Sequence, residues 1–412
     1  MTSTVYIAKN VYGGDGLGRL GDGRVVFVAG AWAGEQVRAE IVEEKKNFVK
    51  ARLVDVVERS ADRVTEKGAE RLDLAIPGMV YDGLSFAGEM KTKEGQLRDF
   101  FERARIEVGA FHASPSPADV TFLNYRNKVV YHFAKQGGGW AIGYRKEPSH
   151  EIIDMPEDPL ARPEINAKLA EIRRSVIMLL TTGPEVVRRA TEQKANVTIR
   201  WTAKTGVRWW LGEAPKDLVL KETTDGLDFE VPADGFYQVN PEVGGQLVKA
   251  VVEEYRKGAA EAPDVLDLYC GVGVFGLCCR PPKLIGVESG RQAIDFARRN
   301  AENLLPRSTS AATPPVSWRF FAEQVGRNLK RIPAGKRTTV IVDPPRGGLE
   351  AGVAKWLAES KAPRIIYVSC DPATLMRDLK EITGGYQVES VRWFNLFPRT
   401  ARFESMVVLR RR

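Results

Sequence analysis

Cysteine and histidine are scarce in this chain of 412 residues, which contains four cysteines and three histidines. All four cysteines lie in the C-terminal half, and no two of them have the spacing of a zinc-binding pair with a second pair to complete the site. The adjacent Cys278 and Cys279 fall within an apolar pattern, so we expect them to pack as small hydrophobic side chains. A structural metal site and a disulfide framework are therefore not expected.

Long apolar runs are also absent. No run approaches the roughly 20 residues that a membrane-spanning helix needs, and the first residues lack the apolar segment of a signal peptide. With 43% hydrophobic and 28% charged residues, the composition is that of an ordinary soluble protein of two or three domains. We expect a cytoplasmic protein that does not associate with membranes, with no protein partner, acting as a monomer.

Acidic residues are outnumbered by basic ones. The chain has 61 Lys and Arg residues against 53 Asp and Glu residues, which gives a formal net charge of +8. This balance is compatible with an acidic macromolecular partner such as RNA or DNA. From charge alone, a somewhat basic enzyme without such a partner is an equally good interpretation.

The most informative stretch is Asp264–Arg280, with the sequence DVLDLYCGVGVFGLCCR. An apolar strand, a glycine turn and a helix start form a cofactor-binding unit, in which Gly271 and Gly273 allow positive φ and close approach of a ligand. Glu288 closes the next strand, at a spacing that suits a carboxylate binding a ribose diol. The third glycine of the dinucleotide fingerprint and the GK[ST] of a P-loop are missing, which favours S-adenosylmethionine as the cofactor.

The sequence pattern predicts three domains. Residues 1–60 contain four or five short strand-like segments with glycine corners, typical of an open barrel of the oligonucleotide-binding type. Residues 61–235 combine an amphipathic helix over 89–107 and a second helix over 160–180 with a β-rich region. Residues 236–412 alternate strands and helices and end in a hairpin, which predicts an α/β fold with a Rossmann-like parallel sheet and antiparallel strands at its edge.

Two features of the first two domains are compatible with RNA contacts. The barrel has a basic edge, which can also be interpreted as a solvated face and consists of Lys45, Lys46, Lys50 and Arg52. Arginines and tryptophans alternate between residues 200 and 210, as in platforms for single-stranded nucleic acid. For most of these tryptophans, a place in the core is the favoured interpretation.

Three further motifs follow or open strands of the α/β domain, at the sheet edge where such folds bind ligands. Asp343 begins DPPR after an apolar strand, Cys370 lies in YVSCDP after the next strand, and Glu404 opens the last strand. DPPR alone is also compatible with an acidic helix cap followed by proline at the first helical position. Its combination with YVSCDP is far more specific for nucleic-acid-modifying methyltransferases.

Taken together, the motifs of the whole chain resemble those of the RNA uracil-C5 methyltransferase family, with an N-terminal barrel similar to a TRAM domain. Besides the GGDGLGR turn, the resemblance rests on YRNK at 125–128, GFYQVNPEV at 235–243, DLYCGVG at 267–273, DPPRGG at 343–348, YVSCDPATLMRDL at 367–379 and FPRTARFE at 397–404. The resemblance implies that Cys370 is the nucleophile and Glu404 the base. It also implies an S-adenosylmethionine site lined by Gln238, Tyr269, Glu288 and Asp343.

The implied chemistry explains why these residue types are needed. Uracil C5 is a poor nucleophile toward a methyl sulfonium, but a thiolate that adds at C6 turns the ring into an enolate whose C5 attacks. A carboxylate then removes the C5 proton so that the cysteine leaves by elimination. Arg346 either lowers the pKa of Cys370 or holds an RNA phosphate. Cys270 lies inside the cofactor turn and is interpreted as a packing residue.

Two local departures from the family pattern concern the site. Val274 stands where an asparagine often follows the second glycine of the cofactor turn, so one cofactor contact differs. Arg402 or Phe403 stands where a histidine usually precedes the base. This second departure changes the expected RNA contacts and leaves Glu404 in place.

Two other functions remain open at this stage. Methyl transfer to a base amino group also uses a DPP-type motif, and a non-catalytic RNA-binding protein would use the same scaffold. Cys370 and Glu404 together count against both. Family members with the N-terminal barrel tend to modify large ribosomal RNA, so we expect 23S ribosomal RNA as the partner, with transfer RNA as the alternative. In either RNA the target base would be flipped out of a folded structure.

A third departure generates a prediction about metal content. Many family members hold an iron–sulfur cluster with four cysteines, but Ile76, Met79 and Asp158-Pro159 stand near the corresponding positions here. Because a [4Fe–4S] cluster needs cysteinate ligands, protein purified without oxygen is expected to be colourless and free of iron. Stoichiometric iron together with a broad visible absorption band would show this prediction to be wrong.

Overall fold

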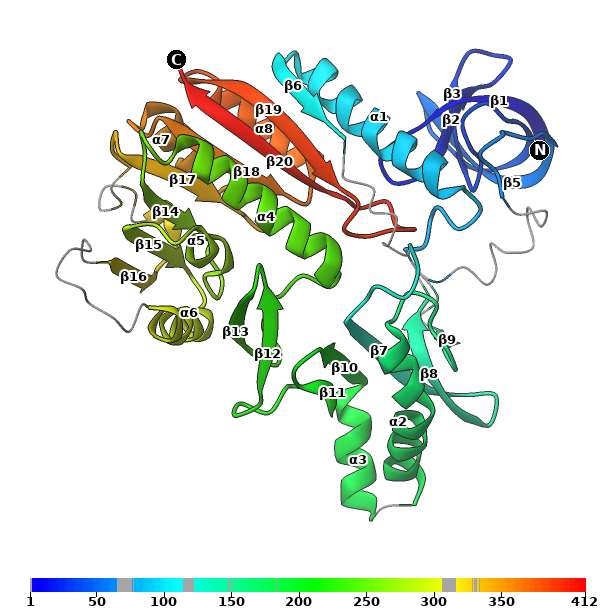
Figure 1. Cartoon of the computed structure of the whole chain (residues 1–412). Coiled ribbons are helices and arrows are strands. Elements are labelled where there is room, and N and C mark those ends of the chain that lie inside the picture. Colours follow the sequence, from blue (N-terminus) through cyan, green and yellow to red (C-terminus); the bar gives the residue numbers. More distant parts are fainter. Residues whose placement is uncertain are drawn as a thin grey trace.

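The computed structural model describes residues 2–64, 76, 78–113, 122–146, 149, 151–182, 184–305, 316–327, 329, 332 and 334–412. Within these residues the chain forms an N-terminal barrel, a central sheet with two helices and a large C-terminal α/β sheet (Figure 1). The predicted mixed α/β architecture with a small N-terminal barrel is therefore confirmed. No helix in the described part of the chain is long and apolar enough to cross a membrane.

The N-terminal barrel is closed, whereas the sequence predicted an open one. Its five strands, joined in the order β1-β2-β3-β5-β4, are β1 (Thr2–Asn10), β2 (Gly16–Arg19), β3 (Val25–Ala29), β4 (Gln36–Glu44) and β5 (Phe48–Glu58). The barrel closes because β2, expected as part of a glycine turn, pairs with both β1 and β3. A Cβ atom on Gly18 would lie 2.4 Å from the Val5 side chain, so glycine permits this close approach.

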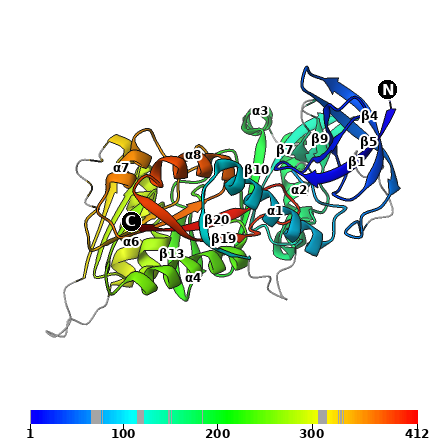
Figure 2. The ribbon, with the colours of Figure 1, turned by 90° about the horizontal axis from the view of Figure 1, so that it is seen from above.

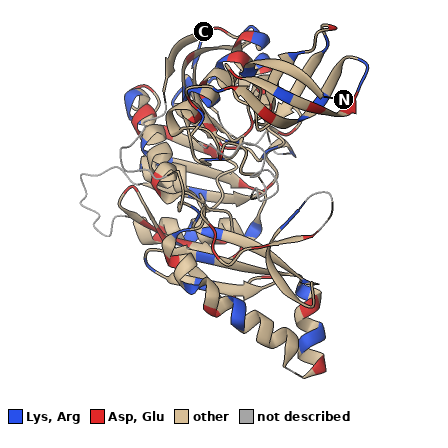
Figure 3. Ribbon diagram, turned by 90° about the vertical axis from the view of Figure 1, so that its right-hand side faces the viewer, with Lys and Arg blue, Asp and Glu red and all other residues tan. Residues whose placement is uncertain are grey.

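The expected basic edge of the barrel is largely neutralised. Lys45 and Lys50 both form ion pairs with Glu43, at 2.8 and 3.0 Å, and Arg52 pairs with Glu40. Figure 3 shows blue and red segments alternating over the barrel strands. Because these pairs are exposed, each contributes little to stability, and the cations remain accessible to a polyanion that competes with the glutamates.

The central domain is an antiparallel sheet in the order β11-β10-β7-β8-β9. Its strands are β7 (Lys128–Gln136), β8 (Gly139–Arg145), β9 (Ile152–Asp154), β10 (Asn196–Thr202) and β11 (Gly206–Leu211). Helix α2 (Pro163–Thr181) was predicted, and it buries one apolar face against this sheet. Helix α3 (Glu185–Lys194) was not predicted, because it buries only Thr191 and so has no apolar stripe to reveal it.

The proposed arginine–tryptophan platform is only partly exposed. Arg200 is buried and forms an ion pair with Glu222 at 3.2 Å, and Trp210 is also buried. Trp209 keeps 37% of its surface exposed. The favoured interpretation, a place in the core, is thus confirmed for Trp210, and the alternative of a nucleic-acid platform is wrong for Arg200 and Trp210.

The C-terminal sheet has eight strands in the order β16-β15-β14-β17-β18-β20-β19-β6. The strands are β14 (Asp264–Leu268), β15 (Lys283–Glu288), β16 (Ser317–Ala322), β17 (Thr338–Val342), β18 (Arg364–Ser369), β19 (Tyr386–Phe394) and β20 (Glu404–Arg411), with β6 (Val108–His112) at the edge. Strands β14 to β18 pair in parallel, while β20 runs antiparallel to both β18 and β19. The predicted parallel sheet with a terminal hairpin is confirmed.

Helices cover both faces of this sheet (Figure 2). One core layer joins the sheet to α4 (Pro241–Gly258), α5 (Val274–Cys279) and α6 (Arg291–Leu304). The other joins it to α1 (Phe86–Ala104), α7 (Val353–Glu359) and α8 (Pro372–Ile382). The sheet is therefore buried on both faces, as its continuous apolar strands require.

A segment from before residue 236 belongs to this sheet. Strand β6 pairs in parallel with β19, and α1 packs against α8. A hairpin of β12 (Val219–Thr224) and β13 (Leu227–Pro232) also packs against α6. The sequence assigned all of this to the 61–235 domain, because a short strand and an isolated helix do not reveal which sheet they join.

The barrel is attached to α1 by contacts along one side of that helix. The side-chain amide of Gln96 donates to the Val11 carbonyl at 2.8 Å, and Lys9 pairs with Asp99. The Tyr12 ring packs edge-on against Phe100. These contacts bring the residues just after β1 close to the C-terminal sheet.

Candidate active site

The predicted site residues follow or open neighbouring strands at one edge of the C-terminal sheet. Leu268 is paired with both Val287 and Val342, so Glu288, Tyr269 and Asp343, each one residue further on, form a row across β15, β14 and β17. Adjacent strands lie about 4.8 Å apart, so this row places three polar side chains along one rim.

Cys370 and Glu404 continue the row on the next two strands. In the antiparallel pair of β18 and β20, Ser369 is opposite Ser405. Continued by one residue beyond the end of β18, this register places Cys370 beside Glu404, and the charge of Glu404 acts on the Cys370 thiol. Residues opposite each other in such a pair have Cα atoms about 4.5–5.5 Å apart. Two residues that are 34 positions apart in the chain are therefore immediate neighbours.

A pocket opens beside the glycine turn, with a volume of about 590 Å³ including open solvent. Four of the predicted cofactor residues contribute to its wall: Gln238, Tyr269, Gly271 and Asp343. Gly273 and Glu288 are not in the wall. Gly273 is the N-cap of α5, and the Glu288 carboxylate accepts a hydrogen bond from the backbone N–H of Gly290 at 2.7 Å.

The backbone around this pocket has the strained geometry expected of a ligand-binding turn. Gly271 and Gly273 have φ values of 54° and 88°, so the prediction of positive φ is confirmed. Tyr269 also has a positive φ of 61°, which is uncommon for a residue with a side chain and is typical of ligand sites. Around Gly271, an added Cβ would find no heavy atom within 4 Å, which leaves room for a ligand.

The sequence analysis missed several residues of the pocket wall, and three of them, Phe236, Thr224 and Gly244, come from different elements. Phe236 is 74% exposed and lies at the pocket, where an aromatic ring has no partner of its own in the described structure. Thr224 hydrogen-bonds Tyr237, and Gly244 packs against Gln238. Only Phe236 carried a usable signal, because it lies in the GFYQVNPEV motif. The residues on β12 and α4 come into the site through packing.

The four cysteines differ sharply in accessibility. Cys270, Cys278 and Cys279 are buried, whereas Cys370 is partly exposed. The Cys270 thiol lies in the cofactor turn with its pKa raised by burial. Of the four thiols, Cys370 alone is open to a substrate, and it directly precedes Asp371, the N-cap of α8.

Glu404 is 4% exposed, and its Oε2 atom has no hydrogen-bond partner in the described structure. Burial, followed by the charge of Asp343, raises the pKa of Glu404 well above its usual value. Burial also raises the pKa of Asp343 to about 7. A buried carboxylate oxygen without a partner is costly, so this atom is suited to a proton or to a ligand that donates one.

The thiol of Cys370 is not activated in the free protein. Burial, then the charges of Glu404 and Asp343, raise its pKa to about 12, and the charge of Arg346 only partly offsets them. Arg346 does lower the pKa of Cys370, which is one of the two options predicted for it, but burial and two carboxylates outweigh its single exposed guanidinium.

The residue before Phe403 extends the site toward the barrel. Arg402 Nη1 lies 3.4 Å from Asp371 Oδ2 and 3.3 Å from the Tyr12 hydroxyl. Arg402 therefore connects the helix cap beside Cys370 to the N-terminal barrel. This contact was not predicted, since nothing in the sequence brings Tyr12 near residue 402.

The positions compared with iron–sulfur ligands are filled differently. Ile76 and Met79 pack with the apolar core of the central sheet. The Asp158 carboxylate accepts hydrogen bonds from Tyr131 and Tyr144 at 2.9 and 2.6 Å. Within the described ranges no group of three or more His, Cys, Asp or Glu side chains is arranged to hold a metal.

Comparison with known proteins agrees with this geometry. Residues 216–412 match the model of the tRNA (uracil-5-)-methyltransferase family, and residues 2–54 match the model of the TRAM domain. The C-terminal part of the chain, residues 216–412, belongs to this family of RNA methyltransferases. The pocket beside the glycine turn, with an open cradle at Gly271 and a carboxylate at Asp343, fits S-adenosylmethionine, the cofactor that the sequence predicts.

Relatives of this methyltransferase cover its whole length. An uncharacterized RNA methyltransferase of Thermotoga maritima is 28% identical, with 99% of each chain aligned. One of Halalkalibacterium halodurans is 26% identical over 98% of this chain and 96% of its own. The crystal structure of Pyrococcus abyssi tRNA (uracil-54, C5)-methyltransferase with S-adenosyl-L-homocysteine has a TM-score of 0.70 at 21% identity, covering 98% of this chain and 99% of that chain. This likeness shows a common fold.

The raised pKa of Cys370 leads to a prediction for thiol alkylation. In the free methyltransferase, the rate with iodoacetamide is expected to rise about 10-fold per pH unit from pH 7.5 to 9.5, because only the thiolate reacts and its fraction grows at that rate below the pKa. Mass spectrometry of the Cys370 peptide measures this rate, and Cys370→Ser is the control. A rate that levels off below pH 8 would contradict a raised pKa.

Proposed function

We propose that this methyltransferase methylates C5 of uridine in RNA through a covalent bond between Cys370 and C6 of the base. The observation that carries this proposal is the register of β18 and β20, which makes the accessible thiol of Cys370 a neighbour of the buried Glu404 carboxyl. Methylation at C5 needs a nucleophile and a proton acceptor that act on the same base. Neither methylation of an amino group nor simple RNA binding needs both groups.

In the first step the Cys370 sulfur bonds to C6, and the electrons of the C5–C6 double bond move toward the O4 carbonyl. S-adenosylmethionine would supply an electrophilic methyl group on a positively charged sulfur. C5 bonds to this methyl carbon as the methyl–sulfur bond breaks, and S-adenosyl-L-homocysteine leaves. The positive charge of Arg346 lowers the pKa of both Cys370 and Glu404 and so favours their charged forms. A cationic ligand beside Asp343 acts in the same direction, so thiolate formation is coupled to a filled cofactor pocket.

In the second step C5 carries both a methyl group and a hydrogen. The Glu404 carboxylate takes this proton, the C5–C6 double bond forms again, and the Cys370 sulfur leaves as a thiolate. Glu404 must be ionised when it accepts the proton. Because the position is buried, a carboxylate at Glu404 is strongly basic, and a strong base is suited to removing a proton from carbon.

The pocket residues divide between the cofactor and the base. Asp343 lies between the cofactor turn and Cys370 in the strand row, so it is placed to contact the cofactor close to the methyl group. Glu288, at the far end of the row, suits the ribose. The exposed ring of Phe236 offers a stacking surface for a flipped-out base.

For the RNA target we propose large ribosomal RNA, with transfer RNA as the second candidate. The barrel supports ribosomal RNA through the tendency of barrel-bearing family members. The Pyrococcus abyssi enzyme is named as a transfer RNA enzyme, and its fold covers this chain with the barrel included. The barrel alone therefore does not exclude transfer RNA.

The mechanism predicts two different defects. Cys370→Ala is expected to abolish methylation and to form no covalent complex, because nothing adds to C6. Glu404→Gln is expected to accumulate an enzyme–RNA adduct that survives denaturing electrophoresis and carries label from methyl-labelled cofactor, because elimination stalls after methyl transfer.

The double variant Cys370→Ala/Glu404→Gln is the control and is expected to form no adduct. An adduct from the double variant would assign the nucleophile to another residue, with Cys270 as the next candidate. If Glu404→Gln is folded but simply inactive without an adduct, the role of Glu404 as the base is wrong.

The RNA target is tested in cells that lack the protein. Mapping of 5-methyluridine in ribosomal and transfer RNA should reveal one or more sites in large ribosomal RNA that disappear, and return with the wild-type protein but not with Cys370→Ala. Loss of sites only in transfer RNA would replace the first candidate with the second.

A further inference from the structure

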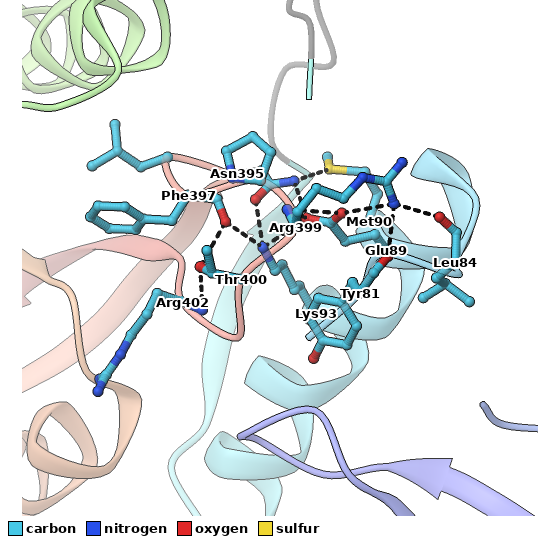
Figure 4. A network of polar contacts seen from close by, with 12 residues as sticks. Tyr81, Leu84, Glu89, Met90, Lys93, Asn395, Phe397, Arg399, Thr400 and Arg402 are labelled. Atoms are coloured by element: carbon cyan, nitrogen blue, oxygen red, sulfur yellow. Dashed lines mark hydrogen bonds and ion pairs between the residues drawn. The ribbon is translucent and has the colours of Figure 1, made fainter. Parts of the chain in front are cut away.

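A cluster of charged side chains is buried between α1 and the loop that joins β19 to β20, outside the cofactor pocket (Figure 4). The side chains of Lys93 and Glu89 have no exposed surface, and that of Arg399 is 5% exposed. Lysine and glutamate are rarely buried completely. The loop comprises residues 395–403 and leads directly into Glu404, the first residue of β20.

The Lys93 ammonium group uses all three of its hydrogen-bond donors. It donates to Glu89 Oε1 at 2.8 Å, to Asn395 Oδ1 at 2.7 Å and to the Phe397 carbonyl at 3.1 Å. Two of these three acceptors belong to the loop, although Lys93 is about 300 positions earlier in the sequence. One ammonium group thus fixes the loop to α1 at two points.

Glu89 holds the same loop through a further set of contacts. Its carboxylate accepts from the Asn395 side chain at 2.9 Å and from the Arg399 backbone N–H at 3.0 Å. Arg399 has a φ of 66°, in the left-handed region that residues other than glycine seldom adopt. Its guanidinium donates to the Tyr81 carbonyl at 2.9 Å. The surrounding contacts therefore fix an unfavourable backbone conformation.

The contacts continue from the cluster toward the chemical residues. Thr400 Oγ1 donates to the Phe397 carbonyl at 2.9 Å and accepts from the Arg402 backbone N–H at 3.2 Å. The Arg402 side chain then reaches Asp371, the residue after Cys370. Figure 4 shows this line of contacts from Lys93 through Phe397 and Thr400 to Arg402.

Glu404 itself lacks such support, since its Oε2 atom has no partner in the described part of the chain. The position of its carboxyl group therefore depends on the backbone that leads to it. A buried ion cluster is seldom the most stable filling for such a space, because apolar side chains of similar volume often serve as well or better. What an ion cluster adds is a single defined geometry of the loop.

We propose that Lys93 is a positioning residue for proton abstraction: together with Glu89 it holds the 395–403 loop so that the Glu404 carboxylate meets C5 of the base bound to Cys370. This inference rests on the proposed function and assigns it a residue far from the strand row. Lys93 does not touch the substrate. It acts through the loop, and its loss should slow elimination more than the earlier steps.

The test uses the full-length enzyme with Lys93→Met, which keeps the length of the side chain and removes its charge and donors. We expect single-turnover methyl transfer to persist, release of the product RNA to slow at least about 10-fold, and a methyl-labelled adduct to accumulate as for Glu404→Gln. The affinity for S-adenosyl-L-homocysteine, measured by calorimetry, is expected to change by less than about 2-fold, because the cluster lies outside the pocket.

The matched control is Arg364→Met. Arg364 forms a nearly buried ion pair with Glu254 at 2.5 Å, at the end of β18 opposite to Cys370. This variant is expected to lower the melting temperature without any adduct. A structural role for Lys93 would give the same pattern, so a Lys93→Met enzyme that matches Arg364→Met, or that turns over like the wild type, overturns the proposal.

A second variant covers the case in which Lys93→Met does not fold, since removal of one partner leaves Glu89 with fewer cations. The double variant Glu89→Gln/Lys93→Met removes both charges together, which buried pairs tolerate better, and the same adduct is expected. If Glu404→Gln forms the adduct and neither Lys93 variant does, the positioning role alone is wrong. If Glu404→Gln forms none, the proposed function fails first.

Discussion

The antiparallel pairing of β18 with β20 is the constraint on which the site depends. It sets Ser369 opposite Ser405 and thereby brings a thiol and a carboxyl group together at the end of the sheet. A shift by one residue would turn every side chain of β20 to the other face. Such a slip is opposed by the burial of the strand, because Met406, Val407, Val408 and Leu409 contact both helical layers.

The same arrangement explains the electrostatics. Three acidic or potentially anionic groups, Asp343, Cys370 and Glu404, share this rim. Besides burial, the charge of Asp343 raises the pKa of both Glu404 and Cys370, and the charge of Glu404 raises that of Cys370. In the free protein these shifts all favour the protonated forms, and added cations favour the charged forms. A positively charged cofactor sulfur and the Arg346 guanidinium would supply them. The free energy needed to ionise these buried groups thus depends on whether the cationic cofactor is bound, which links their ionisation to the order of the chemical steps.

Much of the catalytic domain was predictable, because its strands are apolar and its turns have distinctive residues. The glycine turn at Gly271 and Gly273, and the strand ends at Asp343, Cys370 and Glu404, could be located from local patterns and from resemblance to a family. Local sequence also fixed the hairpin at the end of the chain.

What could not be predicted depends on contacts between distant segments. Strand β6 is short and shows no periodicity of its own, so its place beside β19 was missed. The charged Glu89 and Lys93 read as the polar side of an amphipathic helix, although both are fully buried in the structure. The contact between Tyr12 and Arg402 could not be predicted either, because it exists only through the attachment of the barrel to α1. Burial of charge is a tertiary property that no local pattern reports.

The central claim, that Cys370 bonds to the target base and Glu404 removes a proton from it, is tested most directly with RNA that contains 5-fluorouridine. Fluorine replaces the proton that Glu404 should remove, so the wild-type enzyme is expected to stall after methyl transfer with the base still attached. Mass spectrometry after digestion should find a peptide in which Cys370 carries a methylated 5-fluorouridine nucleotide. The absence of an adduct under conditions where uridine RNA is methylated, or its attachment to Cys270, would contradict the account.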